Sequence, residues 1–158
     1  MKQESKALVS GAAEKLAAFV SACERELTAE AVNGYLCDGF AELCRVLNGL
    51  RMENSGLETL AVAKQMEDSL MALDGCVARV LGRRGREPQR SFRRAAMIVG
   101  SVFKPGAFSA DKVPSVWKGK VTPETYCQMV IDRVCEAIRD PLVWLRDELR
   151  TREMNCGK

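Results

Sequence analysis

The chain has 158 residues, of which 47% are hydrophobic and 28% charged, and its formal net charge is +3. This length and composition fit one ordinary globular domain with a sizeable core, and they exclude low-complexity disorder, a disulfide-built scaffold and a strongly basic chain. No apolar run approaches the roughly 18 residues that a membrane span needs, and acids interrupt the first apolar stretch, so neither a membrane span nor a targeting segment is expected.

Three long helices are predicted in the first half of the chain. The first spans Ser5–Leu27, because apolar residues recur there at steps of three and four. The second is capped by Thr28 and reaches Leu50 as one central helix that is apolar over most of its circumference. The third begins at a capping box of Ser55 and Glu58 and ends at Leu81. Short links near 28–31 and 51–55 favour antiparallel neighbours.

A shorter helix is predicted to begin around Pro88 and to carry one apolar face. Arg90, Arg93, Arg94 and Met97 are placed nearer the surface of this helix. Arginines at a helix N-terminus oppose the helix dipole, so we expect a compensating anion: Glu87, an acid of another helix, or an external ligand. The inner face of the helix consists of Phe92, Ala95, Ala96, Val99, Val102 and Phe103.

A long loop and a final helix complete the chain. Residues 104–121 contain two prolines and two glycines without a sustained period, which predicts a loop. Thr122-Pro123-Glu124 is typical of a helix start. Because proline removes a helical hydrogen bond, Pro141 should either kink this helix or split it. Residues 151–158 are expected to fray.

The predicted fold is therefore all-α, an up-and-down bundle of five helices, or six if Pro141 divides the last one. A single domain is expected, with three N-terminal helices over about 5–81, a basic linker at 82–88, and C-terminal helices over about 88–153. The long loop at about 104–121 connects the last two predicted elements.

Histidine and cysteine content limits the chemistry. The sequence has no histidine, which removes the commonest general base, the commonest zinc ligand and every Ser-His or Cys-His pair. None of the seven cysteines forms a C-x-x-C pair, and several lie on apolar stripes, so free, mostly buried thiols in a reducing cytoplasm are expected. Asp132 and Glu136 form one convincing i, i+4 acid pair, where an all-helical magnesium enzyme needs more. We expect no catalytic residue, no metal and no cofactor.

The stretch Arg79–Arg94 concentrates positive charge. Its net charge of +6 exceeds that of the whole chain, +3, so the remainder is net negative. Arginine pairs well with phosphate or carboxylate, so the segment is a candidate site for an anion or an acidic partner. A solvated, salt-bridged linker is the alternative interpretation. The candidate residues are Arg79, Arg83, Arg84, Arg86, Arg90, Arg93 and Arg94.

The long loop provides a second candidate region. Phe108, Trp117, Lys118 and Lys120 either contact a partner or, for the apolar members, seal one end of the bundle. The functional hypothesis is a non-catalytic helical-bundle protein, an adaptor, scaffold or regulator, that binds another protein, one with an acidic surface for example. The alternative is a nucleic-acid-binding protein that uses segment 79–94 on phosphates. A second copy of the same chain is a further candidate partner.

Overall fold

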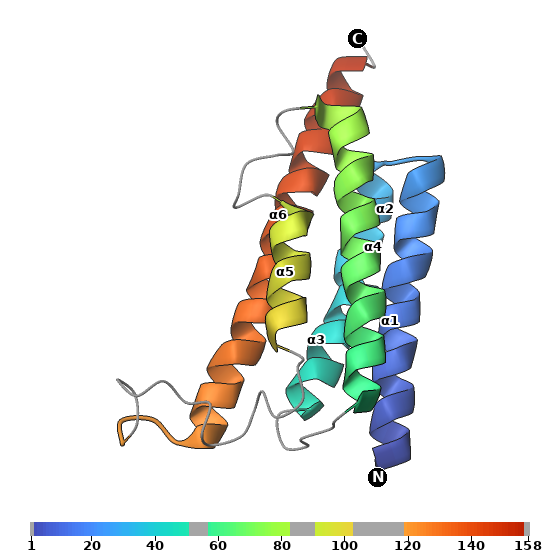
Figure 1. Ribbon diagram of the computed structural model, residues 1–158. Helices are drawn as coiled ribbons and strands as arrows, with labels where there is room; N and C mark the ends of the chain where they lie inside the picture. The colour runs from blue at the N-terminus through green and yellow to red at the C-terminus, as the bar shows by residue number, and fades with distance from the viewer. Residues whose placement is uncertain (1, 51–56, 83–90, 103–118, 157–158) are drawn as a thin grey trace.

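The protein folds into an up-and-down helical bundle, as predicted. A computed structural model describes residues 2–50, 57–82, 91–102 and 119–156, and within these ranges it contains six helices (Figure 1). The chain reverses direction after the first, third, fourth and fifth of them, whereas the second and third run in the same direction. The helices are α1 (Lys2–Arg25), α2 (Ala29–Cys37), α3 (Gly39–Leu50), α4 (Leu57–Leu81), α5 (Phe92–Val102) and α6 (Pro123–Cys156). None of the described helices is both long and apolar enough to cross a membrane.

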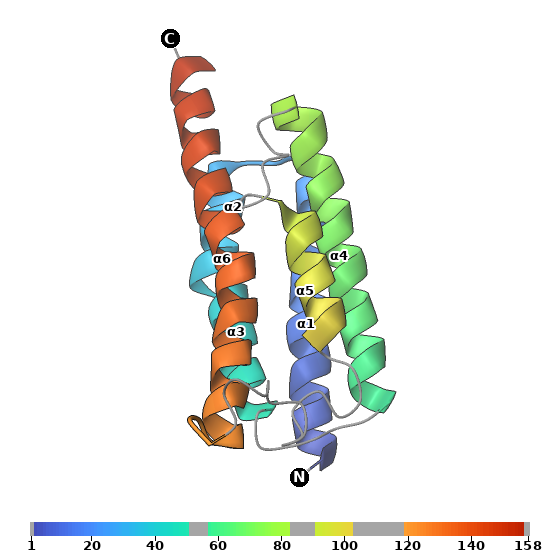
Figure 2. The same ribbon diagram turned by 60° about the vertical axis from the view of Figure 1, so that its left-hand side comes forward.

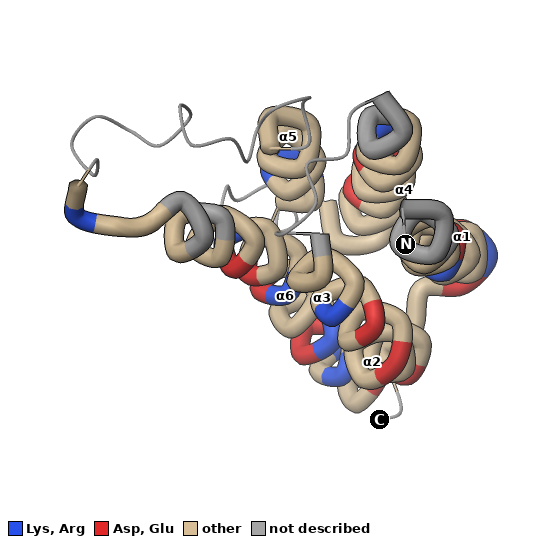
Figure 3. The backbone as a smooth tube through the Cα atoms, turned by 90° about the horizontal axis from the view of Figure 1, so that it is seen from below, with Lys and Arg blue, Asp and Glu red and all other residues tan. Residues whose placement is uncertain are grey.

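Each helix packs on its neighbours around one apolar core. α1 lies between α3 and α4, α4 also packs on α5, and α6 closes the arrangement by contacting α5 on one side and α2 and α3 on the other. This order is visible along the bundle axis in Figure 3. Among the described residues α4 packs mainly on α1 and α5 rather than on α3, so the link at 51–55 joins antiparallel helices that are not close neighbours. The largest fully buried side chains include Leu16, Leu43, Leu70, Phe92, Ile138 and Leu145.

The predicted central helix is in fact two helices, which corrects the expectation of one helix from Thr28 to Leu50. α2 ends at Cys37 and α3 begins at Gly39, because the backbone at Asp38 (φ −117°, ψ −75°) leaves the helical path. The ring of Tyr35 stacks on Phe19 of α1 with centroids 4.4 Å apart, and it occupies the space beside Gly39. The N-terminal part of the domain therefore has four helices, not three. Thr28 caps α2 as predicted, accepting from the Ala31 N–H at 3.1 Å.

The start of α5 also differs from the prediction. α5 begins at Phe92 rather than around Pro88, with Ser91 Oγ accepting from the Arg93 N–H at 3.2 Å as an N-cap. Pro88 lies outside the described residues, as does Ser55 of the predicted capping box. The predicted start of α6 is confirmed, since Thr122 Oγ1 accepts from the Thr125 N–H at 3.1 Å.

α6 runs through Pro141 without ending, so the split that was one of two predicted outcomes is wrong (Figure 2). The predicted fraying from residue 151 is also wrong, because α6 continues to Cys156. Arg152 Nη1 donates to the Val80 carbonyl at 2.9 Å, and Glu153 Oε1 accepts from the Ala29 N–H at 3.0 Å. These contacts tie the last turns of α6 to the ends of α4 and α2.

Candidate interaction surface along α5

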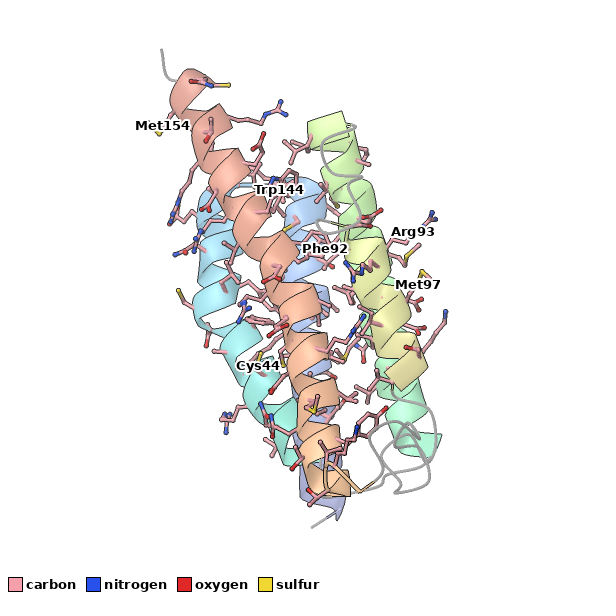
Figure 4. All side chains as sticks on the ribbon, turned by 90° about the vertical axis from the view of Figure 1, so that its left-hand side faces the viewer. Cys44, Phe92, Arg93, Met97, Trp144 and Met154 are labelled. Carbon is pink, nitrogen blue, oxygen red and sulfur yellow. The ribbon has the colours of Figure 1, made fainter. Side chains whose placement is uncertain are left out.

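The buried side of α5 determines which residues point outward. Phe92 and Val99 are completely buried, and Ala95 and Ala96 nearly so, which fixes the rotation of the helix against α4 and α6. The residues between them therefore face away from the core. Figure 4 shows Arg93 and Met97 projecting away from the bundle, and 70% of Met97 is exposed. We call the exposed residues Arg93, Arg94, Met97 and Ser101 the α5 surface.

An acid of α4 holds the N-terminus of α5. Asp74 Oδ1 accepts from Ser91 Oγ at 3.3 Å and from the Arg93 N–H at 3.4 Å. A carboxylate at a helix N-terminus interacts favourably with the dipole, which offsets the unfavourable position of Arg93 and Arg94. Of the three anions considered from the sequence, an acid of another helix is thus in place. Glu87 lies outside the described residues.

A cleft of about 260 Å³ opens between α5 and α6 beside the α5 surface. Two guanidinium groups, from Arg94 and Arg133, and two carboxylates, from Glu136 and Asp140, line it. Ala137, a residue of the cleft wall, lies four positions before Pro141. Because proline has no N–H, the Ala137 carbonyl lacks its usual helical hydrogen bond from residue 141. The cleft therefore presents groups of both charges, suited to binding polar side chains or backbone of a partner. Ser91, Ile98 and Ala137 complete the lining.

Four of the residues selected from the sequence can be placed. Arg93 and Arg94 lie together on the α5 surface, whereas Arg79 is exposed near the end of α4 and donates from Nη2 to Cys76 Sγ at 3.2 Å. Lys120 is exposed in a turn beside Gly119, whose φ is +82°. The other selected residues lie outside the described ranges: Arg83, Arg84, Arg86, Arg90, Phe108, Trp117 and Lys118.

Sequence reasoning missed the contribution of α6 to this surface. Arg133 lines the same cleft as Arg94 although they lie far apart in the sequence, and only its exposed position on a helix could have indicated it. The two members of the acid pair serve different contacts. Asp132 accepts from Gln128 Nε2 at 2.7 Å, next to α3, whereas Glu136 lines the cleft with α5.

Comparisons with known proteins give no relative to reason from. No family model, no curated protein and no solved structure matches the chain. Within the described residues, no group of three or more cysteine, aspartate or glutamate side chains is placed to hold a metal ion. The physical character of the α5 surface is therefore the basis for a functional proposal.

Proposed function

We propose that the protein is a non-catalytic interaction protein, of the adaptor, scaffold or regulatory kind, and that its α5 surface binds an acidic patch on another protein. The observation that supports this most directly is the 70% exposure of Met97, one turn after Arg93 and Arg94. Methionine and arginine are both enriched at protein interfaces. Arginine also pairs bidentately with carboxylates, so the expected partner surface combines acids with an apolar centre.

Charge distribution favours α5 over the other exposed methionine of similar character. Met154, at the end of α6, is 69% exposed and lies four residues after Arg150, the same spacing as Met97 and Arg93. Glu148 lies two residues before Arg150 and Glu153 lies directly before Met154, however, whereas α5 contains no acid. In Figure 3, α5 carries the colour of basic residues and none of the colour of Asp and Glu. An acidic partner would therefore select α5.

A non-catalytic role in the cytoplasm is part of the same proposal. The chain has no histidine, and the Asp74 carboxylate that accepts from the Ser91 hydroxyl also accepts from the Arg93 N–H at the N-terminus of α5, which gives this contact a capping role. The six cysteines whose side chains are described are free thiols, which supports a reducing compartment.

Nucleic acid remains the second candidate partner. Arg93 and Arg94 are exposed and are the last two residues of the basic segment 79–94, so they could neutralise phosphates. Against this, Met97 rather than an aromatic ring flanks them, and single-stranded nucleic acids are usually bound with stacking aromatics. Phosphate contacts would also weaken steeply with salt, which separates the two candidates experimentally.

The experiment uses two variants with the same substitutions at the same spacing. Tagged wild type, Arg93→Gln/Met97→Gln and Arg150→Gln/Met154→Gln are used as baits in an extract of the source cells, and co-purified proteins are quantified by mass spectrometry. We expect at least one partner that wild type and the α6 variant retain and that the α5 variant loses by tenfold or more. Equal recovery by all three baits would overturn the proposal.

A parallel assay addresses the second candidate. Labelled single- and double-stranded RNA and DNA are titrated with the same three proteins at low and near-physiological salt. Steeply salt-dependent binding that only the α5 variant loses would replace the protein partner with nucleic acid. No binding at low salt would remove nucleic acid from consideration.

A further inference from the structure

Two contacts fix the register between the antiparallel helices α4 and α5 (Figure 1). At one end of the pair, Asp74 of α4 accepts hydrogen bonds from Ser91 Oγ and from the Arg93 N–H. At the other end, the carboxylate of Glu67 occupies the space beside Gly100, where a side chain would otherwise lie. The two contacts are seven residues apart on each helix, so equal steps in opposite directions connect them.

This register places two exposed methionines side by side. Met71 lies on α4 between the two acids, one turn from each, and Met97 lies on α5 between the two residues that these acids contact. Because positions three, four and seven apart share one side of a helix, each methionine borders the neighbouring helix. Met71 is 40% exposed and Met97 is 70% exposed. Together they form an apolar patch across the α4–α5 contact, which we call the methionine seam.

The charges that project beside the methionine seam are positive at one end. Arg93 and Arg94 are exposed at the start of α5, and no acid of the described residues pairs with either guanidinium. The nearby acids are engaged in the helix contact, because Asp74 caps α5 and Glu67 lies half-buried against Gly100. A partner that covers the seam would therefore meet unpaired cations at the N-terminal end of α5.

The position of Met71 beside a second methionine distinguishes it from the other exposed methionines. Met129 of α6 is also 40% exposed, and Met154 of the same helix is 69% exposed. These two lie 25 residues apart on one helix, which separates them by about 37 Å along its axis. They cannot share one patch, whereas Met71 and Met97 can be covered by a single partner element.

The side of α4 that continues the methionine seam carries small side chains. Gly75 lies one turn after Met71, is exposed, and has open space where a Cβ would lie. Ala78 lies two turns after Met71 and is half-buried. Small residues allow another backbone to come close, and the flexible thioethers of methionine adapt to the apolar side chains that they meet. The surface is therefore suited to an element as broad as a helix.

We propose that the methionine seam is the docking surface for one amphipathic helix of the partner protein. The apolar side chains of that helix cover Met71 and Met97, and acids near one of its ends pair with Arg93 and Arg94. Amphipathic helices are commonly recognised in this way, by an apolar surface with complementary charges at its edge. This inference rests on the proposed function of the α5 surface, and it adds the form of the partner and the participation of α4.

The test follows isotope-labelled methionine methyl groups of the full-length chain by NMR. In the free protein, a nuclear Overhauser effect should connect the methyl groups of Met71 and Met97. The probe is a stapled peptide of about 16 residues, because short isolated helices are marginal in water, with leucines along one face and glutamates on the other. A scrambled peptide and a peptide with lysines in place of the glutamates are the controls. We expect only the acidic amphipathic peptide to shift both methyl groups saturably, without shifts at Met129 or Met154.

Three surface variants separate the docking surface from the proposed function. Met71→Gln and Met97→Gln should each weaken peptide binding by about tenfold, whereas Met129→Gln, at an equally exposed position to Met71, should not. If only Met97→Gln weakens binding, the methionine seam is refuted while the α5 surface stands. If the acidic amphipathic peptide does not bind, or the scrambled peptide binds equally well, the helical partner is refuted. Methyl shifts that depend on protein concentration alone would replace the partner helix with a second copy of the chain.

Discussion

Replacing Gly39 with alanine should destabilise the protein, although the same change usually stabilises a helix. Alanine is favoured over glycine inside a helix by about 0.5–1 kcal/mol. At Gly39, however, the new Cβ would lie 2.5 Å from Cε1 and 2.6 Å from Cδ1 of Tyr35. The ring cannot easily withdraw, because Tyr35 is only 6% exposed and stacks on Phe19 with an interplanar angle of 8°.

The size of the effect follows from two opposing contributions. Overpacking a well-filled core costs about 1–3 kcal/mol, and the gain in helix propensity offsets less than about 1 kcal/mol of it because Gly39 is the first residue of α3. We expect a net loss of about 1–2 kcal/mol in the free energy of unfolding. Gly75 is the matched control, because it lies inside α4 and a Cβ added there would point into open space. Gly75→Ala should therefore stabilise by about 0.5–1 kcal/mol.

Urea denaturation at 25 °C, followed by far-UV circular dichroism, measures both variants against wild type. The two midpoints should move in opposite directions with little change in the denaturant slope. A double variant, Tyr35→Leu/Gly39→Ala, removes the ring, so the alanine should then cost less than it does alone. If Gly39→Ala is as stabilising as Gly75→Ala, the close contact between Tyr35 and Gly39 does not terminate α2.

Three further changes address the core. The Tyr35 hydroxyl is buried without a hydrogen-bond partner among the described residues, so Tyr35→Phe should stabilise by about 1 kcal/mol in the same urea assay, and a loss of that size would show that the hydroxyl is bonded. Phe92→Ala should cost about 3–5 kcal/mol, because the side chain is fully buried where α5 packs, and hydrogen exchange should show α5 opening before α1. Burial raises the pKa of the Cys23 thiol from 9.0 to about 12, so with rising pH this thiol ionises in the unfolded chain before it ionises in the folded protein. The contribution of Cys23 to the free energy of unfolding is therefore complete below pH 9 and should be lost between pH 9 and 12. Cys23→Ala should reduce the slope of the free energy of unfolding against pH in this range by about 1 kcal/mol per pH unit. An unchanged slope would show that other groups cause the loss of stability.

The helical class, most helix positions and the outward side of α5 could be predicted from local sequence patterns. Thr28 and Thr122 cap helices as their side chains predict, and Phe92, Ala95 and Val99 are buried while Arg93, Arg94 and Met97 are exposed. These features depend on the 3.6-residue period and on hydrogen bonds between residues three positions apart, so they are readable locally. A few stripe positions, such as Leu8 and Val80, are nevertheless 50% and 40% exposed, because the edge of a stripe extends beyond the contact.

The positions of helix breaks and the contacts between distant residues depend on how the helices pack. The six helices result from the break at Asp38, where Tyr35 packs on α1, and not from Pro141, whose buried neighbours Leu142 and Leu145 hold α6 together. Asp74 at the start of α5 and Arg133 beside Arg94 each bring together residues of separate helices. Their positions depend on the register and order of the helices in space. Local periodicity does not encode these, because several compact arrangements bury the same apolar stripes.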